Sequence, residues 1–135
     1  MGRRLGQHSL VKGKTLERIA EAACGEHTPQ VVEIGPGRGA LTEHLLARAG
    51  RVIAIELDDN LAGYLRERWK QESRLEIVAA DALALNWSSW GAGVLAGNLP
   101  YYVATPIVSR YVNDPGSLAA AVFLIQKEVA DESIG

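Results

Sequence analysis

Cysteine is almost absent from this sequence, as are long apolar runs and any excess of positive charge. The single cysteine among 135 residues, Cys24, allows no internal disulfide and no cysteine metal cluster, so we expect no bound metal. No apolar run approaches the roughly 20 residues of a membrane span, and the N-terminus lacks the apolar segment of a signal peptide. A formal net charge of −2 argues against nucleic-acid binding by bulk electrostatics. We therefore expect a cytoplasmic monomer without membrane contact, in which any basic patch is local.

Three alternate glycines, Gly35, Gly37 and Gly39, follow a short apolar run and precede leucines at helical spacing. This pattern predicts a buried strand, a tight turn and the N-terminus of a helix. Glycine lets the backbone approach a ligand more closely than a Cβ would allow, and the N–H groups that open a helix face that ligand. The pattern favours an adenosine-containing cofactor beside Gly35 and Gly37, although a plain strand-to-helix connection can have the same composition.

Acidic residues stand at the ends of the next two predicted strands. Glu56 closes the apolar run 52–55, about 20 residues beyond the glycines, where nucleotide-binding sheets place an acceptor for both ribose hydroxyls. Asp81 closes the run 75–80 and could accept a hydrogen bond from an adenine amine, while the Ala82 N–H donates to a ring nitrogen. The alternative for Glu56 is a neighbour of a helix N-cap without a ligand.

Strand and helix patterns alternate along the whole chain. We predict strands at 31–34, 52–56, 75–80, 94–97 and 119–125, and helices at 16–24, 41–48, 58–71 and from Thr105-Pro106 onward. This alternation is typical of an α/β fold with a doubly wound parallel sheet, which binds ligands at the carboxyl ends of its strands. Since no internal repeat or linker is visible, we expect residues 1–135 to form one domain.

Six ordered blocks carry the remaining information. They are Gly6-Gln7-His8 with Leu10, Glu33-Ile34-Gly35-Pro36-Gly37-Arg38-Gly39 with Leu41-Thr42, Ile55-Glu56, Asp81-Ala82, Asn98-Leu99-Pro100-Tyr101, and Gln126-Lys127-Glu128-Val129. Together they resemble the rRNA adenine N6,N6-dimethyltransferases of the KsgA type, which use S-adenosylmethionine. The resemblance implies a Rossmann-like fold of the class I S-adenosylmethionine-dependent methyltransferases.

The same resemblance implies roles for individual residues. The cofactor, S-adenosylmethionine before transfer and S-adenosylhomocysteine after it, would contact His8, Leu10, Gly35, Glu56, Asp81 and Asn98. Asn98, Leu99, Pro100 and Tyr101 would hold the target adenine of small-subunit (16S) rRNA or its precursor particle. An adenine amine is a poor nucleophile because its lone pair is delocalised into the ring. The Asn98 side-chain oxygen and the Leu99 or Pro100 carbonyl could accept its hydrogens while Tyr101 stacks on the base.

The sequence departs from the family pattern in two places. Ser9 stands where the family usually has Phe, next to the predicted contact His8. Such enzymes also continue past the Gln126 block into two more strands and a small helical domain. We therefore expect this chain to be the cofactor-binding core, truncated after the fifth strand and without that helical domain, so that RNA specificity comes from elsewhere.

Three other functions remain open at this point. A methyltransferase of 23S rRNA is the nearest, although such enzymes typically have Ile where this chain has Leu99. A nicotinamide-dependent oxidoreductase would need Gly-x-Gly-x-x-Gly rather than alternate glycines. A non-enzymatic RNA-binding protein or transcription factor could retain the same core, but the intact Asn98 block disfavours it.

Overall fold

A computed structural model describes residues 13–25 and 28–127 of the chain. Two of the predicted cofactor contacts, His8 and Leu10, lie outside these residues, as does the departure at Ser9. The other predicted site residues all fall within the described ranges.

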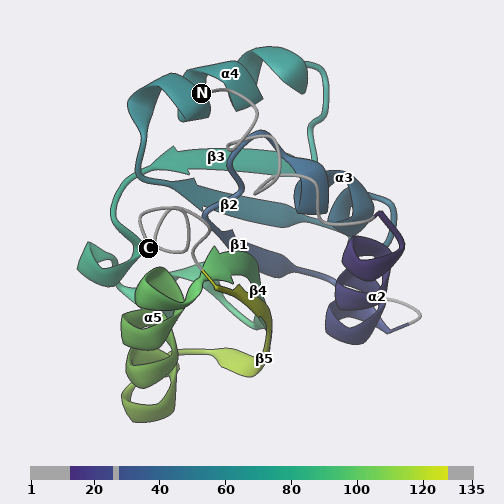
Figure 1. Ribbon diagram of the computed structural model, residues 1–135. Helices are drawn as coiled ribbons and strands as arrows, with labels where there is room; N and C mark the ends of the chain where they lie inside the picture. The colour runs from purple at the N-terminus through teal and green to yellow at the C-terminus, as the bar shows by residue number, and fades with distance from the viewer. Residues whose placement is uncertain (1–12, 26–27, 128–135) are drawn as a thin grey trace.

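Five parallel strands form one sheet in the described residues (Figure 1). They are β1 Val31–Ile34, β2 Val52–Glu56, β3 Leu75–Ala79, β4 Gly93–Pro100 and β5 Leu118–Gln126. Their order is β3-β2-β1-β4-β5, so the chain moves outward from β1 to one edge and then returns to build the other. All pairings are parallel, and the carboxyl ends therefore meet at one edge of the sheet. The predicted doubly wound α/β fold is confirmed.

Helices cover both faces of this sheet. They are α2 Gly13–Cys24, α3 Ala40–Leu46, α4 Asp59–Arg68 and α5 Tyr101–Asn113, with the short 3-10 helices η1 Ala82–Ala84 and η2 Trp87–Trp90. One cluster of buried residues joins α2 and α3 to β1, β2 and β4. The other joins α5, η1 and η2 to the opposite face of the same strands. Alternation along each strand explains this: Val31 belongs to the first cluster and Val32 to the second.

The start of α5 differs from the prediction. The helix begins at Tyr101, directly after β4, and Pro106 lies inside it rather than opening it. Pro100 is the N-cap, with φ −63° and ψ 154°, so the chain turns from strand to helix without a loop. Pro106 has no N–H to donate to the preceding turn. At that same turn the Thr105 hydroxyl donates to the Tyr101 carbonyl at 2.8 Å.

Two smaller boundaries also differ. β4 extends to Pro100, because residues Asn98 to Pro100 continue the pairing with β5. The helix predicted to reach Gln71 ends at Arg68, since Trp69 leaves the helical region with φ −116° and ψ 35°.

Candidate functional site

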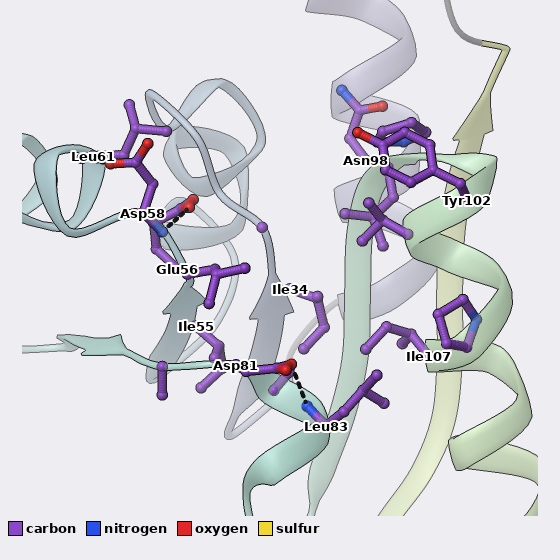
Figure 2. A pocket seen from close by; sticks show the side chains of 18 residues that line it. Ile34, Ile55, Glu56, Asp58, Leu61, Asp81, Leu83, Asn98, Tyr102 and Ile107 are labelled. Atoms are coloured by element: carbon purple, nitrogen blue, oxygen red, sulfur yellow. Dashed lines mark hydrogen bonds between the residues drawn. The ribbon is translucent and has the colours of Figure 1, made fainter.

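A cavity of about 680 Å³ opens at the carboxyl edge of the sheet. The ends of β1, β2 and β4, the segment around η1 and the first turns of α5 form its walls (Figure 2). Its volume lies within the range of small-molecule sites. Seven of the predicted site residues line it: Gly35, Glu56, Asp81, Ala82, Asn98, Leu99 and Pro100.

The glycine turn approaches the cavity at a point where a side chain would not fit. Gly35, Gly37 and Gly39 all have positive φ, at 64°, 61° and 96°. A Cβ on Gly35 would lie 2.9 Å from Leu99 Cδ2, so the turn after β1 rests directly on the strand end of β4. Positive φ and this close approach together explain why glycine is needed at position 35.

Glu56 is fixed by backbone groups on both sides. Its side chain is buried at the end of β2, where Oε1 accepts from the Gly37 N–H and Oε2 from the Asp58 N–H, each at 3.0 Å. A carboxylate oxygen can accept a second hydrogen bond, so each can still receive a hydroxyl proton from a ligand. The carboxylate is thus held in one orientation beside the cavity.

Asp81 and Ala82 lie at the turn that follows β3. Asp81 is the N-cap of η1, and its Oδ1 accepts from the Leu83 N–H at 3.0 Å. The η1 segment is held from the other side by Arg110 of α5, whose guanidinium donates to the carbonyls of Leu83 and Leu85 at 3.1 and 3.0 Å. One wall of the cavity is therefore anchored to the helix that follows Asn98.

Asn98 lies at the carboxyl end of β4, half-buried at the rim of the cavity. Its Oδ1 accepts a hydrogen bond of 2.6 Å from Gln126 Nε2. Leu99 is buried beside Gly35, and Pro100 caps α5. All three residues line the cavity.

Tyr101 and Tyr102 open α5 side by side. Both are more than half exposed, but Tyr102 rather than Tyr101 is among the described residues that line the cavity. Figure 2 shows Tyr102 next to Asn98. The sequence analysis named Tyr101 from the Asn98-Leu99-Pro100-Tyr101 block, and Tyr102 lies one residue beyond that block. A helix beginning at Tyr101 turns successive side chains by about 100°, which separates the two rings.

Apolar side chains make up much of the cavity wall, and the sequence analysis assigned no binding role to them. They are Ile34, Ile55, Leu57, Leu61, Leu83, Val103 and Ile107, with Pro106. Leu57 is 70% exposed. Its position directly after the strand-end acid Glu56 was the feature of the sequence that could have indicated an apolar binding surface. An apolar wall with a few polar groups at strand ends suits a nucleoside.

Glu33 is a second buried acid near the glycine turn. Burial is the main cause that raises the pKa of its carboxyl to about 8. The hydrogen bond from Thr42 opposes this rise, and the charge of Glu56 adds to it. The Thr42 hydroxyl donates to Glu33 Oε1 at 2.5 Å. Glu33 does not line the cavity within the described part of the chain.

The residues present fit an adenosine-containing cofactor. The backbone of Gly35 borders the cavity where a Cβ would collide with Leu99, and a fixed carboxylate and an apolar wall stand beside it. Among residues 13–25 and 28–127 there is no cluster of His, Cys, Asp and Glu that could hold a metal ion. No helix in those ranges is long and apolar enough to cross a membrane.

Comparisons with known proteins agree on one family. The family model described as "Ribosomal RNA adenine dimethylase" matches residues 2–135. A curated relative named "Ribosomal RNA small subunit methyltransferase A" from Desulfitobacterium hafniense is 41% identical over 133 residues, covering 96% of this chain and 48% of the relative. A protein of the same name from Acidobacterium capsulatum is 39% identical over 95% of this chain and 47% of its own length.

Two solved structures are similar to this one. The 23S rRNA methyltransferase ErmE is 34% identical with a TM-score of 0.76, over 87% of this chain and 47% of its own. A dimethyladenosine transferase from Plasmodium falciparum is 28% identical with a TM-score of 0.70, over 92% of this chain and 45% of its own. The present chain spans about half the length of the curated relatives that it matches.

Proposed function

Because this chain belongs to the ribosomal RNA adenine dimethylase family, we propose that it is the cofactor-binding core of a cytoplasmic enzyme that dimethylates adenine N6 in small-subunit rRNA. Its fold is that of the class I S-adenosylmethionine-dependent methyltransferases. The observation that carries the proposal is the meeting of the glycine turn, Glu56 and Asn98 at one cavity. Residues 1–135 would form this core, and the helical domain of the family would lie outside them.

The cofactor would lie across the carboxyl ends of β1, β2 and β3. Gly35 and Gly37 have no side chains, so the cofactor could approach the backbone of the turn closely. Glu56 would accept hydrogen bonds from both ribose hydroxyls. Asp81 and the Ala82 N–H would recognise the adenine edge, while Leu57 and Leu83, which line the same cavity, cover its faces. His8 and Leu10 would add contacts from the N-terminal block.

Methyl transfer would then depend on positioning. When bound, S-adenosylmethionine supplies an electrophilic methyl group on a sulfonium. Asn98 and the Leu99 or Pro100 carbonyl would accept the hydrogens of the target amine and hold its lone pair in line with that methyl group. Such positioning can contribute about 7–11 kcal/mol without a strong general base. Tyr101, with Tyr102 at the cavity rim, would stack on the unpaired base.

Two observations bear on the identity of the RNA. Relatives named for the small ribosomal subunit cover nearly the whole chain at about 40% identity, and this favours small-subunit rRNA. The 34% identity to a 23S rRNA methyltransferase supports the alternative substrate, 23S rRNA. A methyl-transfer assay on small-subunit particles and on protein-free 23S rRNA separates the two. With a version of the chain extended to the full family length we expect incorporation into the particles alone, and with the 135 residues alone little or no incorporation.

Calorimetry with S-adenosylhomocysteine and NAD tests the cofactor assignment directly on this chain. We expect S-adenosylhomocysteine to bind more tightly, because Glu56 and Asp81 at the same cavity suit a single adenosine. Tighter binding of NAD would refute the methyltransferase assignment. Cofactor binding without methyl transfer by a version extended to the full family length would favour a non-enzymatic RNA-binding role.

A further inference from the structure

The Gln126 block resembles the family but has no role in the function proposed above. Gln126 ends β5, which pairs with β4 in parallel, and its register partner is Pro100. Its side chain reaches back to the residue two positions earlier on β4, where Nε2 donates to Asn98 Oδ1 at 2.6 Å. This hydrogen bond joins the Asn98 side chain to the neighbouring strand β5.

Strand alternation places this pair on one side of the sheet. Ala96 and Val122 belong to the cluster under α2 and α3, and Asn98 and Gln126 continue the same alternate positions on β4 and β5. Leu99 faces the other side, where it packs in the cluster with α5. The hydrogen bond therefore lies beside the cavity, at its β5 side, rather than within the apolar wall.

The two ends of an asparagine carboxamide have nearly the same shape but opposite hydrogen-bonding character. The last side-chain torsion of Asn has a broad, roughly two-fold preference, so rotamer preference alone does not decide which end faces a ligand. A hydrogen bond from Gln126 on the neighbouring strand couples this choice to a second side chain, which donates from Nε2 in the structure. Because Gln126 donates from Nε2, the oxygen of Asn98 is fixed in place and keeps a second lone pair for another donor.

We propose that Gln126 is a positioning residue that fixes the orientation of the Asn98 carboxamide at the rim of the cavity. This inference rests on the proposed function, in which Asn98 accepts a hydrogen from an amine beside the transferable methyl group. Gln126 touches neither cofactor nor target base in this role and acts through Asn98. The Gln126 block then serves the same site as the Asn98 block.

Two cofactor analogues can test this without RNA. S-adenosylhomocysteine has no group at the methyl position, whereas sinefungin carries a protonated amine there. The ratio of their dissociation constants therefore reports on acceptors around the methyl position. Calorimetry gives this ratio for the unaltered chain, Gln126→Met, Asn98→Ala and the double variant. Ile125→Met is the matched control, since Ile125 is 51% exposed and lies one position along β5, on the other face of the sheet.

We expect Gln126→Met to weaken the binding of sinefungin relative to that of S-adenosylhomocysteine by about two- to tenfold, the range expected for one hydrogen bond. In the Asn98→Ala background the same substitution should change the ratio by less than about twofold, because the residue through which it acts is gone. The control should leave the ratio unchanged. The proposal would be overturned if Gln126→Met changed the ratio of dissociation constants equally with and without Asn98→Ala, or left it unchanged in the otherwise unaltered chain.

A second measurement covers the case in which a variant loses stability. In amide NMR spectra of the ligand-free chain, the hydrogen-bonded Gln126 side-chain proton should shift upfield in Asn98→Ala, and an unmoved signal would also refute the pair. Failure of both ligands to bind the unaltered chain would instead refute the proposed function. The two kinds of failure are therefore distinguishable.

Discussion

Glu56 has two tasks at the end of β2, because it faces the cavity and also accepts hydrogen bonds from the Gly37 and Asp58 N–H groups. Glu56→Gln keeps the shape of the side chain but turns one acceptor oxygen into a donor. One of the two N–H groups then loses its partner, which costs about 1–3 kcal/mol when the group is buried. We expect a loss of this size in the free energy of urea unfolding, together with weaker S-adenosylhomocysteine binding.

Glu67→Gln is the control for this substitution. Glu67 is exposed on α4 and forms an i, i+3 ion pair with Lys70, so its loss should change stability by less than about 1 kcal/mol. Cofactor affinity unchanged in Glu56→Gln would remove Glu56 from the binding site.

Glu33 makes stability depend on pH in the direction opposite to most acids. Burial is the main cause that raises the pKa of its carboxyl to about 8, from an ordinary value of 4.5. Between these values the folded chain binds a proton that the unfolded chain has released. Stability is therefore highest below pH 4.5 with respect to this group and falls as pH rises toward 8, by at most about 1.4 kcal/mol per pH unit.

Glu33→Gln should remove this slope, since an amide does not titrate and its oxygen can still accept from Thr42. Urea unfolding of both proteins at several values between pH 5 and pH 8 measures the difference, which should grow in favour of the variant as pH rises. Parallel curves would show that Glu33 does not retain its proton on folding.

Side-chain roles could be inferred from residue type where geometry was simple, and not where backbone groups intervened. The place of Gly35 and of the strand-end acids at one edge of the sheet could be predicted, because the carboxyl ends of parallel strands meet there. The double backbone contact of Glu56 and the capping role of Asp81 depend on turn conformations that no residue pattern specifies. The raised pKa of Glu33 follows from its burial, and its place in the glycine block gave no indication of that.

At the scale of elements, the glycine turn allows backbone strain at positive φ to be measured separately from the steric contact of an added Cβ. Gly35 and Gly37 have nearly the same φ, but a Cβ meets Leu99 only at Gly35, and nothing lies within 4 Å of one at Gly37. Gly37→Ala should therefore cost about 1–2 kcal/mol from backbone strain alone. Gly35→Ala should cost more in urea unfolding, because the Leu99 side chain or the strand end must move as well.

The comparison also reports on the cavity. Gly35→Ala should weaken S-adenosylhomocysteine binding more than Gly37→Ala does, since only the former moves residues beside Asn98. Equal losses of stability in the two variants would mean that the contact between the turn and β4 is relaxed at no cost.

Helix α5 supports the wall of the cavity through Arg110. Besides its bonds to Leu83 and Leu85, the guanidinium lies 4.7 Å from the centroid of the Trp87 ring. Arg110→Met removes these three interactions and an i, i+4 ion pair with Asp114, but keeps most of the apolar stem. We expect S-adenosylhomocysteine to bind several-fold more weakly, because Leu83 and the neighbouring Asp81 lose their anchor, and calorimetry measures this.

Arg66→Met is a matched control from α4. Arg66 also donates to a backbone carbonyl, that of Ile77 at 3.1 Å, and neither residue lines the cavity. Its affinity for the cofactor should stay unchanged. If both variants bind alike, the anchoring by Arg110 is irrelevant to binding.

Element types were predictable from apolar spacing, whereas the junction of β4 and α5 was not. The sequence predicts that Pro106 opens the helix, because proline suits a first turn. Pro100 was the better signal, since its fixed φ also suits the residue before a helix, and the structure uses it as the N-cap. Tyr102 is absent from the predicted site for a separate reason, because the Asn98 block ends at Tyr101.

At the scale of the whole molecule, the site combines strands that are distant in the sequence. β1 lies between β2 and β4, which follow it at very different separations along the chain. The first half of the sheet carries the glycine turn, Glu56 and Asp81. The second half, β4 and β5, carries Asn98 and Gln126.

This strand order has a consequence for folding kinetics. Closing a longer loop costs more entropy before any contact compensates for it, so we expect β1 to pair with β2 in the transition state and with β4 only afterwards. Ile53→Val in β2 should then slow refolding, while Ile107→Val in α5 should mainly accelerate unfolding. Both side chains are buried in the same cluster, which makes them a matched pair for stopped-flow measurements in urea.

If instead Ile107→Val slowed refolding and Ile53→Val mainly accelerated unfolding, the folding nucleus would lie at β4 and α5. With the expected partition, the half of the molecule that we propose to recognise adenosine is ordered first. The strand that presents Asn98 would then dock onto a sheet edge that already exists.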